Sequence, residues 1–71
     1  MADALNAITA RAYVAGEMSA GAYRFQINTV EARKEDGSEF YEVKGAYDTY
    51  YGTFGFHWTV WLENGRLYGE W

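Results

Sequence analysis

The side chain best suited to exchange protons near neutral pH is His57, the only histidine among 71 residues. A histidine with a carboxylate beside it can act as a general base. Folding the end of the chain into a hairpin places Glu70 diagonal to His57, and Glu42 is expected on the neighbouring strand. A histidine on a strand is more often part of a solvated face, however, and Ser19 and Ser38 lie in no nucleophile motif. We therefore expect no catalytic residues and no enzymatic activity.

The sequence also lacks the usual ligands for a metal or a cofactor. It contains no cysteine, and one histidine cannot complete a structural zinc site. The acidic residues follow no EF-hand spacing, and Glu35 and Asp36 are expected in a tight turn. The segment 52–55, Gly-Thr-Phe-Gly, lacks the lysine and the following helix of a phosphate-binding loop. We predict neither a metal site nor a cofactor site.

Aromatic residues make up 20% of the chain and are the remaining signal for a function. Strand alternation places Trp61, Tyr68 and Phe40 on the sheet face that should meet solvent. Tryptophan and tyrosine dominate binding hot spots, and a purely solvated face favours few large aromatics. The alternative is that Trp61 packs on Tyr68 only to stabilise the hairpin. The predicted interaction surface consists of Trp61, Tyr68, His57, Phe40 and Glu70.

The charge of the chain narrows the choice of partner. The net charge is −4, and the six basic residues are scattered along the chain. A nucleic-acid binder or an anionic membrane surface would require a basic patch. No apolar run approaches the roughly 18 residues of a membrane span, and the N-terminus lacks the pattern of a secretory signal. Because the absence of cysteine fits a reducing compartment, we expect a cytoplasmic protein that binds neither nucleic acids nor membranes.

The terminal hairpin is the best-specified element that positions these side chains. Asn64-Gly65 predicts its turn, because both residues tolerate the positive φ of a type I′ turn. The strands are predicted at 54–63 and 66–71, with Trp61 opposite Tyr68 and Trp58 opposite Trp71. One face carries the predicted interaction surface. The other is a predicted core face, made of Phe54, Phe56, Trp58, Val60 and Leu62.

A second hairpin is predicted around Asp36-Gly37, with strands at 22–34 and 39–48 and with Val30 opposite Val43. The alternation slips between Ile27 and Val30. One extra residue corrects the slip, so we predict a β-bulge at 28–29.

A loop at 49–53, which contains the aromatic pair Tyr50 and Tyr51, joins the two hairpins. The predicted pairing across this loop places Tyr41 beside Leu62, Val43 beside Val60, Gly45 beside Trp58 and Tyr47 beside Phe56.

The alanine-rich segment 3–15 is predicted to be a helix that starts at Asp3 and ends at Gly16. Its apolar residues at helical spacing are Leu5, Ile8, Ala12 and Ala15. The alternation from Ile8 to Val14 would also fit a fifth strand, but alanine favours helices over strands. The predicted fold is α+β: one domain, 1–71, with the N-terminal helix packed on a four-stranded antiparallel meander in a roll-like arrangement.

One helix laid across an antiparallel meander resembles the cystatin-like rolls. Val14-Ala15-Gly16 is similar to part of the loop by which cystatins enter protease clefts. The cystatin order, with a longer helix before the loop strand, is absent. The resemblance therefore implies a fold and no function.

These observations favour a small, acidic, non-catalytic protein-interaction module that acts through the outer sheet face. It would form a homodimer, or act as an inhibitor or adaptor that binds a protein partner. The alternative is a protein that binds a small ligand or a carbohydrate. That ligand would occupy the outer aromatics or a pocket lined by Tyr23, Tyr41, Tyr47 and Trp58.

Overall fold

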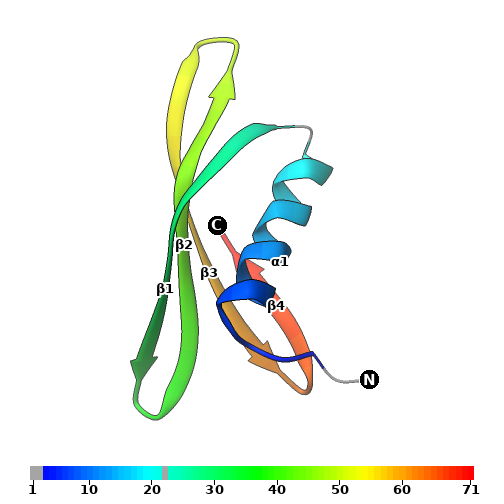
Figure 1. Cartoon of the computed structure of the whole chain (residues 1–71), viewed down its shortest axis with the longest axis vertical. Helices are drawn as coiled ribbons and strands as arrows, with labels where there is room; N and C mark the ends of the chain where they lie inside the picture. Colours follow the sequence, from blue (N-terminus) through cyan, green and yellow to red (C-terminus); the bar gives the residue numbers. More distant parts are fainter. Residues whose placement is uncertain (1–2, 22) are drawn as a thin grey trace.

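The computed structural model describes residues 3–21 and 23–71, and it confirms the α+β fold (Figure 1). Helix α1 spans Ala7–Ala20 and packs on one face of a four-stranded antiparallel sheet. The strands lie side by side in chain order: β1, Arg24–Glu35; β2, Ser38–Thr49; β3, Gly52–Glu63; and β4, Arg66–Glu70. Within the described residues, no helix has both the length and the apolar character needed to cross a membrane.

The two predicted Gly-containing turns are confirmed. Asp36 and Asn64 each have a φ of 51°, and the glycines that follow them also have positive φ. These are the conformations that a type I′ turn requires. The predicted pairing of Val30 with Val43 and of Trp61 with Tyr68 is present. The strand bounds lie within two residues of the predicted ones, apart from Ala22, which lies outside the described residues.

The predicted β-bulge is also confirmed. Ile27 pairs with Gly45 and Thr29 pairs with Lys44, so Asn28 is the extra residue in β1. Its side chain accepts a hydrogen bond of 2.9 Å from Gln26 Nε2. The bulge restores the alternation, because Phe25, Ile27 and Val30 all pack against the core.

The helix bounds predicted from the sequence are wrong by about one turn. Asn6, and not Asp3, is the N-cap: its side chain accepts from Thr9 N at 2.9 Å, and Thr9 Oγ1 accepts from Asn6 N at 3.0 Å. Asp3 instead binds the terminal hairpin, where its carboxylate accepts from Leu67 N at 3.0 Å. Gly16 lies inside the helix, which therefore contains the segment 14–16 that resembled a cystatin loop.

This displacement changes which helix face is buried. Ala10, Val14 and Met18 have no exposed surface, whereas Ile8, predicted among the apolar positions, is 80% exposed. The core is completed by residues of β2 and β3, namely Val43, Phe56, Trp58 and Val60. The sequence analysis missed Met18 because the predicted helix ends at Gly16, before this residue.

The predicted register between the two hairpins is wrong by two residues. Tyr41 pairs with Val60, Val43 with Trp58, Gly45 with Phe56 and Tyr47 with Phe54. The connection is a tight turn of Tyr50 and Tyr51, closed by the pair Thr49 and Gly52, and not a five-residue loop. Thr49 Oγ1 stabilises it by accepting from Tyr51 N at 3.0 Å and donating to Gly52 O at 2.9 Å. Because side chains alternate with a period of two, the shift leaves each residue on its predicted face.

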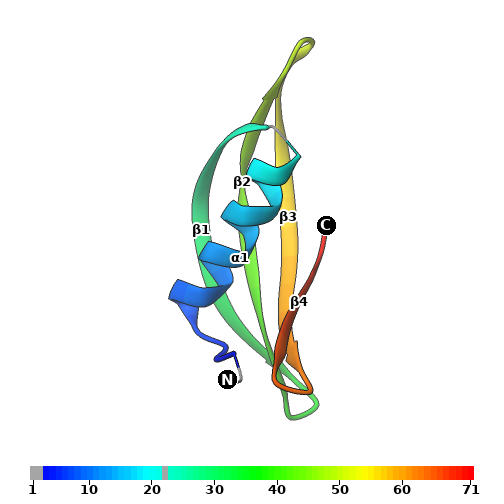
Figure 2. The same cartoon turned by 90° about the vertical axis from the view of Figure 1, so that its right-hand side faces the viewer.

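The β2–β3 hairpin extends well beyond the helix (Figures 1 and 2). A helix of 14 residues is about 21 Å long, whereas a strand of 12 residues spans about 40 Å. The helix therefore covers only the middle of the inner sheet face. Phe54 and Leu62, at the two ends of the predicted core face, are 49% and 39% exposed.

Candidate functional site

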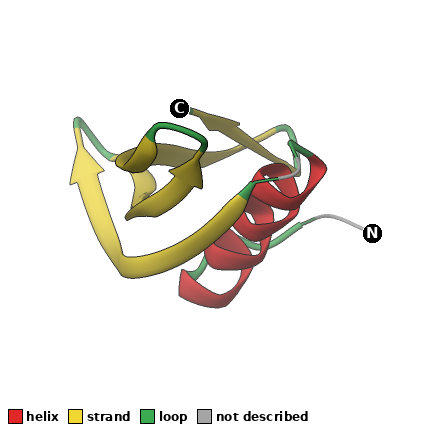
Figure 3. Ribbon diagram, turned by 90° about the horizontal axis from the view of Figure 1, so that it is seen from above, coloured by secondary structure: helices red, strands yellow, loops and turns green. Residues whose placement is uncertain are grey.

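The outer face of the sheet is the side that α1 does not cover, as the view along the sheet shows (Figure 3). There the structure brings together three of the five predicted surface residues in one cross-strand row. Phe40 of β2 lies opposite Trp61 of β3, and Trp61 lies opposite Tyr68 of β4. We call Phe40, Trp61 and Tyr68 the aromatic row.

Two rings of the aromatic row pack on each other on this face. The Trp61 and Tyr68 rings stack, with centroids 6.1 Å apart and planes 22° from parallel. Tyr68 is 40% exposed, while Phe40 and Trp61 are partly buried. Cross-strand aromatic packing of this kind stabilises a hairpin by roughly 0.2–1 kcal/mol. It also leaves apolar surface open to a partner.

His57 lies on the same face, next to a carboxylate. Its Nε2 atom is 3.5 Å from Glu42 Oε1, which makes a charge pair only when the imidazole is protonated. Lys44 lies directly opposite His57. Glu70 pairs with Thr59 and so takes the predicted position diagonal to His57, but Glu42 is the carboxylate in contact. Half of the His57 side chain is exposed, and His57 is not among the residues that line the grooves of about 440, 380 and 260 Å³ on the described part of the chain.

An ion network connects β1, β2 and β3 beside the aromatic row. Arg33 Nη2 is 2.7 Å from Glu31 Oε2, and Arg33 Nε is 3.2 Å from Glu42 Oε2. The hydrogen bond and charge of Glu31, reinforced by Glu42, raise the pKa of the Arg33 guanidinium above its ordinary value. Arg33 therefore stays protonated, and its partners are engaged within the sheet.

A groove opens where the aromatic row ends. The pairing of β2 with β3 stops at Phe40 and Trp61. Beyond this point β2 continues with β1 and β3 continues with β4, so the two hairpins diverge. The groove between them has a volume of about 440 Å³ and is lined by Ser38, Glu39, Phe40, Thr59, Trp61, Leu62 and Glu63.

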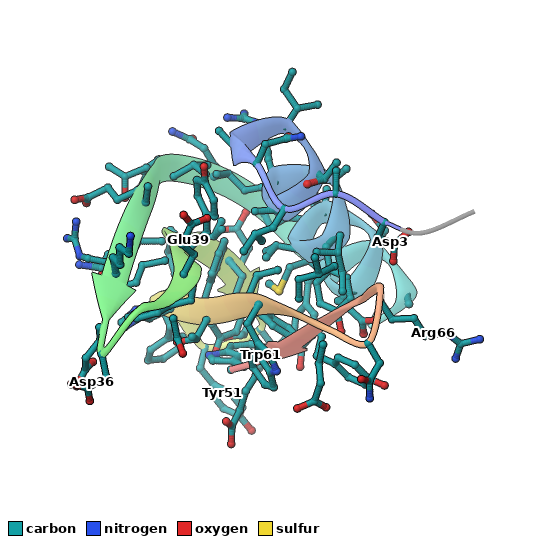
Figure 4. The ribbon with its side chains drawn as sticks, turned by 90° about the horizontal axis from the view of Figure 1, so that it is seen from below. Asp3, Asp36, Glu39, Tyr51, Trp61 and Arg66 are labelled. Atoms are coloured by element: carbon teal, nitrogen blue, oxygen red, sulfur yellow. The ribbon has the colours of Figure 1, made fainter. Side chains whose placement is uncertain are left out.

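Figure 4 looks onto this end of the molecule. Asp36 and Arg66 mark the two diverging turns, and Trp61 lies between them. Glu39 lies on the strand that borders the gap. No signal in the sequence pointed to this groove, because it depends on where two independent hairpins separate.

A second group of exposed aromatics includes the loop pair Tyr50 and Tyr51 that the sequence singled out. Alternation also places Tyr23, Phe54 and Trp71 on the inner face, yet they are 38–50% exposed. They surround Tyr47 at the end of the inner face that the helix leaves open. Tyr50 and Tyr51, at the hairpin tip, are 97% and 87% exposed. The predicted helix is shorter than the predicted strands, and this difference in length could have indicated that Tyr23, Phe54 and Trp71 are exposed.

The predicted inner ligand pocket is occupied by the protein's own rings. Tyr23 and Tyr47 pack edge to face with centroids 5.1 Å apart, and Trp71 lies 5.1 Å from Tyr47 and 5.9 Å from Trp58. The Trp58 indole Nε1 donates to Met18 Sδ at 3.4 Å, and this contact is buried. Three of the four residues predicted to line the pocket, Tyr23, Tyr47 and Trp58, are thus packed against other side chains of the protein.

Within residues 3–21 and 23–71, no three His, Cys, Asp or Glu side chains are grouped so that they could hold a metal ion. Comparisons with protein-family models, curated proteins and solved structures found no match to this chain.

Proposed function

We propose that this chain is a small non-catalytic protein-interaction module that binds its partner through the outer sheet face. The observation that carries the proposal is the aromatic row, which joins three strands on the face without a helix and borders an open groove. Binding energy at protein interfaces is concentrated in tryptophan, tyrosine and arginine anchors of this kind. His57 and Glu70 lie beside the row and would contribute the polar rim.

The partner is either a second copy of the chain or a different protein. The net charge of −4 favours a different, basic protein, because complementary charge accelerates association and two acidic copies repel each other. The same net charge argues against nucleic acid or an anionic membrane surface as the target. A chain without cysteine has no need of an oxidising compartment, which supports a cytoplasmic location.

The double variant Trp61→Ala, Tyr68→Ala tests this proposal. Both side chains lie outside the buried core, so we expect the variant to keep the far-UV circular dichroism of the wild type. Self-association in sedimentation velocity, or affinity for a partner, should fall by at least about tenfold, as expected for hot-spot residues. Tyr50→Ala, Tyr51→Ala is the matched control, since it removes two exposed aromatics at the far tip. Equal behaviour of the two double variants would contradict the proposal.

Carbohydrate binding is the second candidate, and the near-parallel rings of Trp61 and Tyr68 favour it. A sugar ring stacks on an aromatic ring through its apolar face, and the Tyr68 side chain is 40% exposed. The test is the quenching of tryptophan fluorescence by a monosaccharide. Saturable quenching that is lost in a Trp61→Ala variant would support carbohydrate binding in place of protein binding.

A further inference from the structure

One edge of β3 has no neighbouring strand over part of its length. β4 pairs with β3 from Glu63 back only as far as Thr59, whereas β3 begins at Gly52. In Figure 2 β4 accompanies only the lower part of β3. On this side of β3, no strand among the described residues pairs with the segment 52–58. We call this segment the open edge.

The backbone groups of the open edge point away from the sheet. Thr59 exchanges hydrogen bonds with Glu70, because bonded and non-bonded pairs alternate from the closing pair at the Asn-Gly turn. Every second residue of a strand directs its N–H and C=O to the same side. Thr53, Gly55 and His57 therefore direct theirs to the side that β4 does not reach. A chain in extended conformation is the partner that can pair with groups at this spacing.

The other two edges of the sheet carry features that hinder pairing with a further strand. β1 contains the bulge at Asn28 and has charged side chains at five of its 12 positions. β4 has only five residues, and Asp3 accepts a hydrogen bond from Leu67 N on its outer side. Bulges, charges, prolines and short strands protect edges. The open edge has none of these, since the sequence contains no proline and no Asp, Glu, Lys or Arg between Asp48 and Glu63.

Exposed apolar side chains lie beside the open edge on the inner sheet face. Phe54 is 49% exposed, and its ring centroid lies 6.2 Å from that of Tyr47. Trp71 is 50% exposed and packs 5.1 Å from Tyr47 and 6.3 Å from Phe56. A strand added at the open edge would therefore bury apolar surface in addition to pairing backbone groups.

We propose that the open edge pairs with the open edge of a second copy of the chain around a two-fold axis. Aligning Thr53 of each copy with Gly55 of the other gives two pairs, each of which exchanges both of its N–H···O bonds. Phe54 then lies at the axis and faces its counterpart on the inner side. In this register Tyr51 is level with His57 of the second copy, so each hairpin tip ends short of the other copy's β4.

The charge of the open edge favours a second copy over a basic protein. An uncharged edge offers no carboxylate to a basic partner and matches an identical uncharged edge. Asp48 directly precedes the uncharged stretch, and its Oδ1 accepts from Thr53 Oγ1 at 2.7 Å. In the dimer the two strands that carry Asp48 are three strand spacings apart, about 14 Å, beyond the Debye length of about 8 Å at physiological ionic strength. Salt screens the remaining repulsion, so it should strengthen the dimer.

Sedimentation velocity of the full-length protein from about 5 µM to 1 mM tests the dimer. We expect a monomer–dimer equilibrium that tightens by about twofold or more between about 0.05 M and 0.5 M salt. A monomer at every concentration would overturn the proposal and leave the open edge to an extended segment of a different protein. Assemblies that grow beyond two copies would also overturn it, because a two-fold interface closes at the dimer.

Charge exchange at Phe54 tests the two-fold register. Phe54→Lys or Phe54→Glu alone should raise the dissociation constant of the dimer by about tenfold or more, because like charges then face each other across the axis. An equimolar mixture of the two variants should form a heterodimer at least about fivefold tighter than either homodimer. Leu62→Lys and Leu62→Glu are the matched controls, at a partly exposed position near the other end of β3. Failure of the mixture to recover association would overturn the register.

A proline at the open edge tests the backbone pairing. Gly55→Pro removes an N–H that points away from the sheet, so it should weaken the dimer by about tenfold or more while the fold is kept. Ala32→Pro is the matched control, since Ala32 follows the same alternation on the outer edge of β1. Equal weakening by the two substitutions would mean that the open edge is not the interface.

This interface lies apart from the aromatic row and does not depend on the proposed function. Trp61→Ala, Tyr68→Ala should therefore leave the dissociation constant of this dimer unchanged. Loss of a different protein partner in that variant, with the dimer intact, supports both proposals. Loss of the dimer in that variant would place self-association on the aromatic row and overturn the assignment to the open edge.

Discussion

At the scale of single residues, Gly45 is the position where one added carbon would be least tolerated. A Cβ there would lie 2.0 Å from Gln26 O and 2.6 Å from Phe56 Cζ. The sequence predicted that Gly45 lies beside Trp58, whereas the observed register places Phe56 opposite it.

Gly45→Ala should therefore destabilise the protein by about 1–3 kcal/mol, the range typical of overpacking. Gly55→Ala is the control, because its nearest non-neighbour atom would be 3.8 Å away and Gly55 lies on the strand beside Gly45. Urea denaturation followed by tryptophan fluorescence measures both. A similar loss of stability in the two variants would show that β-propensity, and not the contact with Gln26 and Phe56, causes the destabilisation at position 45.

Met18 illustrates what a residue pattern cannot reveal. It is fully buried and accepts a hydrogen bond from the Trp58 indole across 40 positions of the sequence. A buried indole N–H needs a partner, and thioether sulfur is a weak acceptor that fits irregular space. Nothing local to Met18 indicates this contact. It follows from the way the helix crosses the sheet.

At the scale of elements, the helix shows how two acceptable caps compete. Asp3 and Asn6 both have side chains that can cap a helix. Asn6 has Thr9 at the position that completes a capping box, whereas Asp3 gains hydrogen bonds to the terminal hairpin, at Gly65 O and Leu67 N. The helix therefore starts one turn later than the first good cap. The same shift moves Gly16 from the predicted end of the helix into its interior.

Gly16→Ala consequently tests the helix bounds. In the interior, with no atom within 4 Å of the added Cβ, alanine should stabilise the protein by about 0.5–1 kcal/mol. If Gly16 ended the helix in a left-handed conformation, the substitution would destabilise it instead. Gly37→Ala, at a φ of 81°, provides the destabilising reference. Thermal unfolding shows whether Gly16→Ala raises or lowers the stability of the protein.

At the scale of the whole molecule, strands β2 and β3 are longer than the helix that packs on them. The molecule measures 39 × 25 × 16 Å, and the β2–β3 hairpin forms one end of its long axis (Figure 1). The helix covers the middle of this hairpin, where Val43 and Trp58 are buried. Phe54, which is closer to the hairpin tip, is half exposed. Regions with fewer buried contacts open at a lower free energy than the core does.

Hydrogen exchange should therefore divide this hairpin in two. We expect the amides of Tyr47 and Phe54 to exchange about tenfold faster or more than those of Val43 and Trp58, although both are cross-strand pairs of the same ladder. Native-state exchange followed by NMR measures each amide. Equal protection at the two pairs would mean that the exposed arm unfolds only with the core.

The features that depend on neighbouring residues could be predicted from the amino-acid sequence. Asp36-Gly37 and Asn64-Gly65 require positive φ and so located two turns, and these turns with strand alternation assigned each side chain to a face. The slip between Ile27 and Val30 located the bulge in the same way. The same alternation groups Trp61, Tyr68 and Phe40 on the outer face.

The features that depend on contacts between distant segments could not be predicted in this way. A two-residue shift keeps every side chain on its face, so alternation could not choose the register between β2 and β3. The exposure of Trp71 and Phe54 follows from how far the helix reaches across the sheet. The groove beside Trp61 exists because two hairpins, each specified by its own turn, diverge where their shared ladder ends.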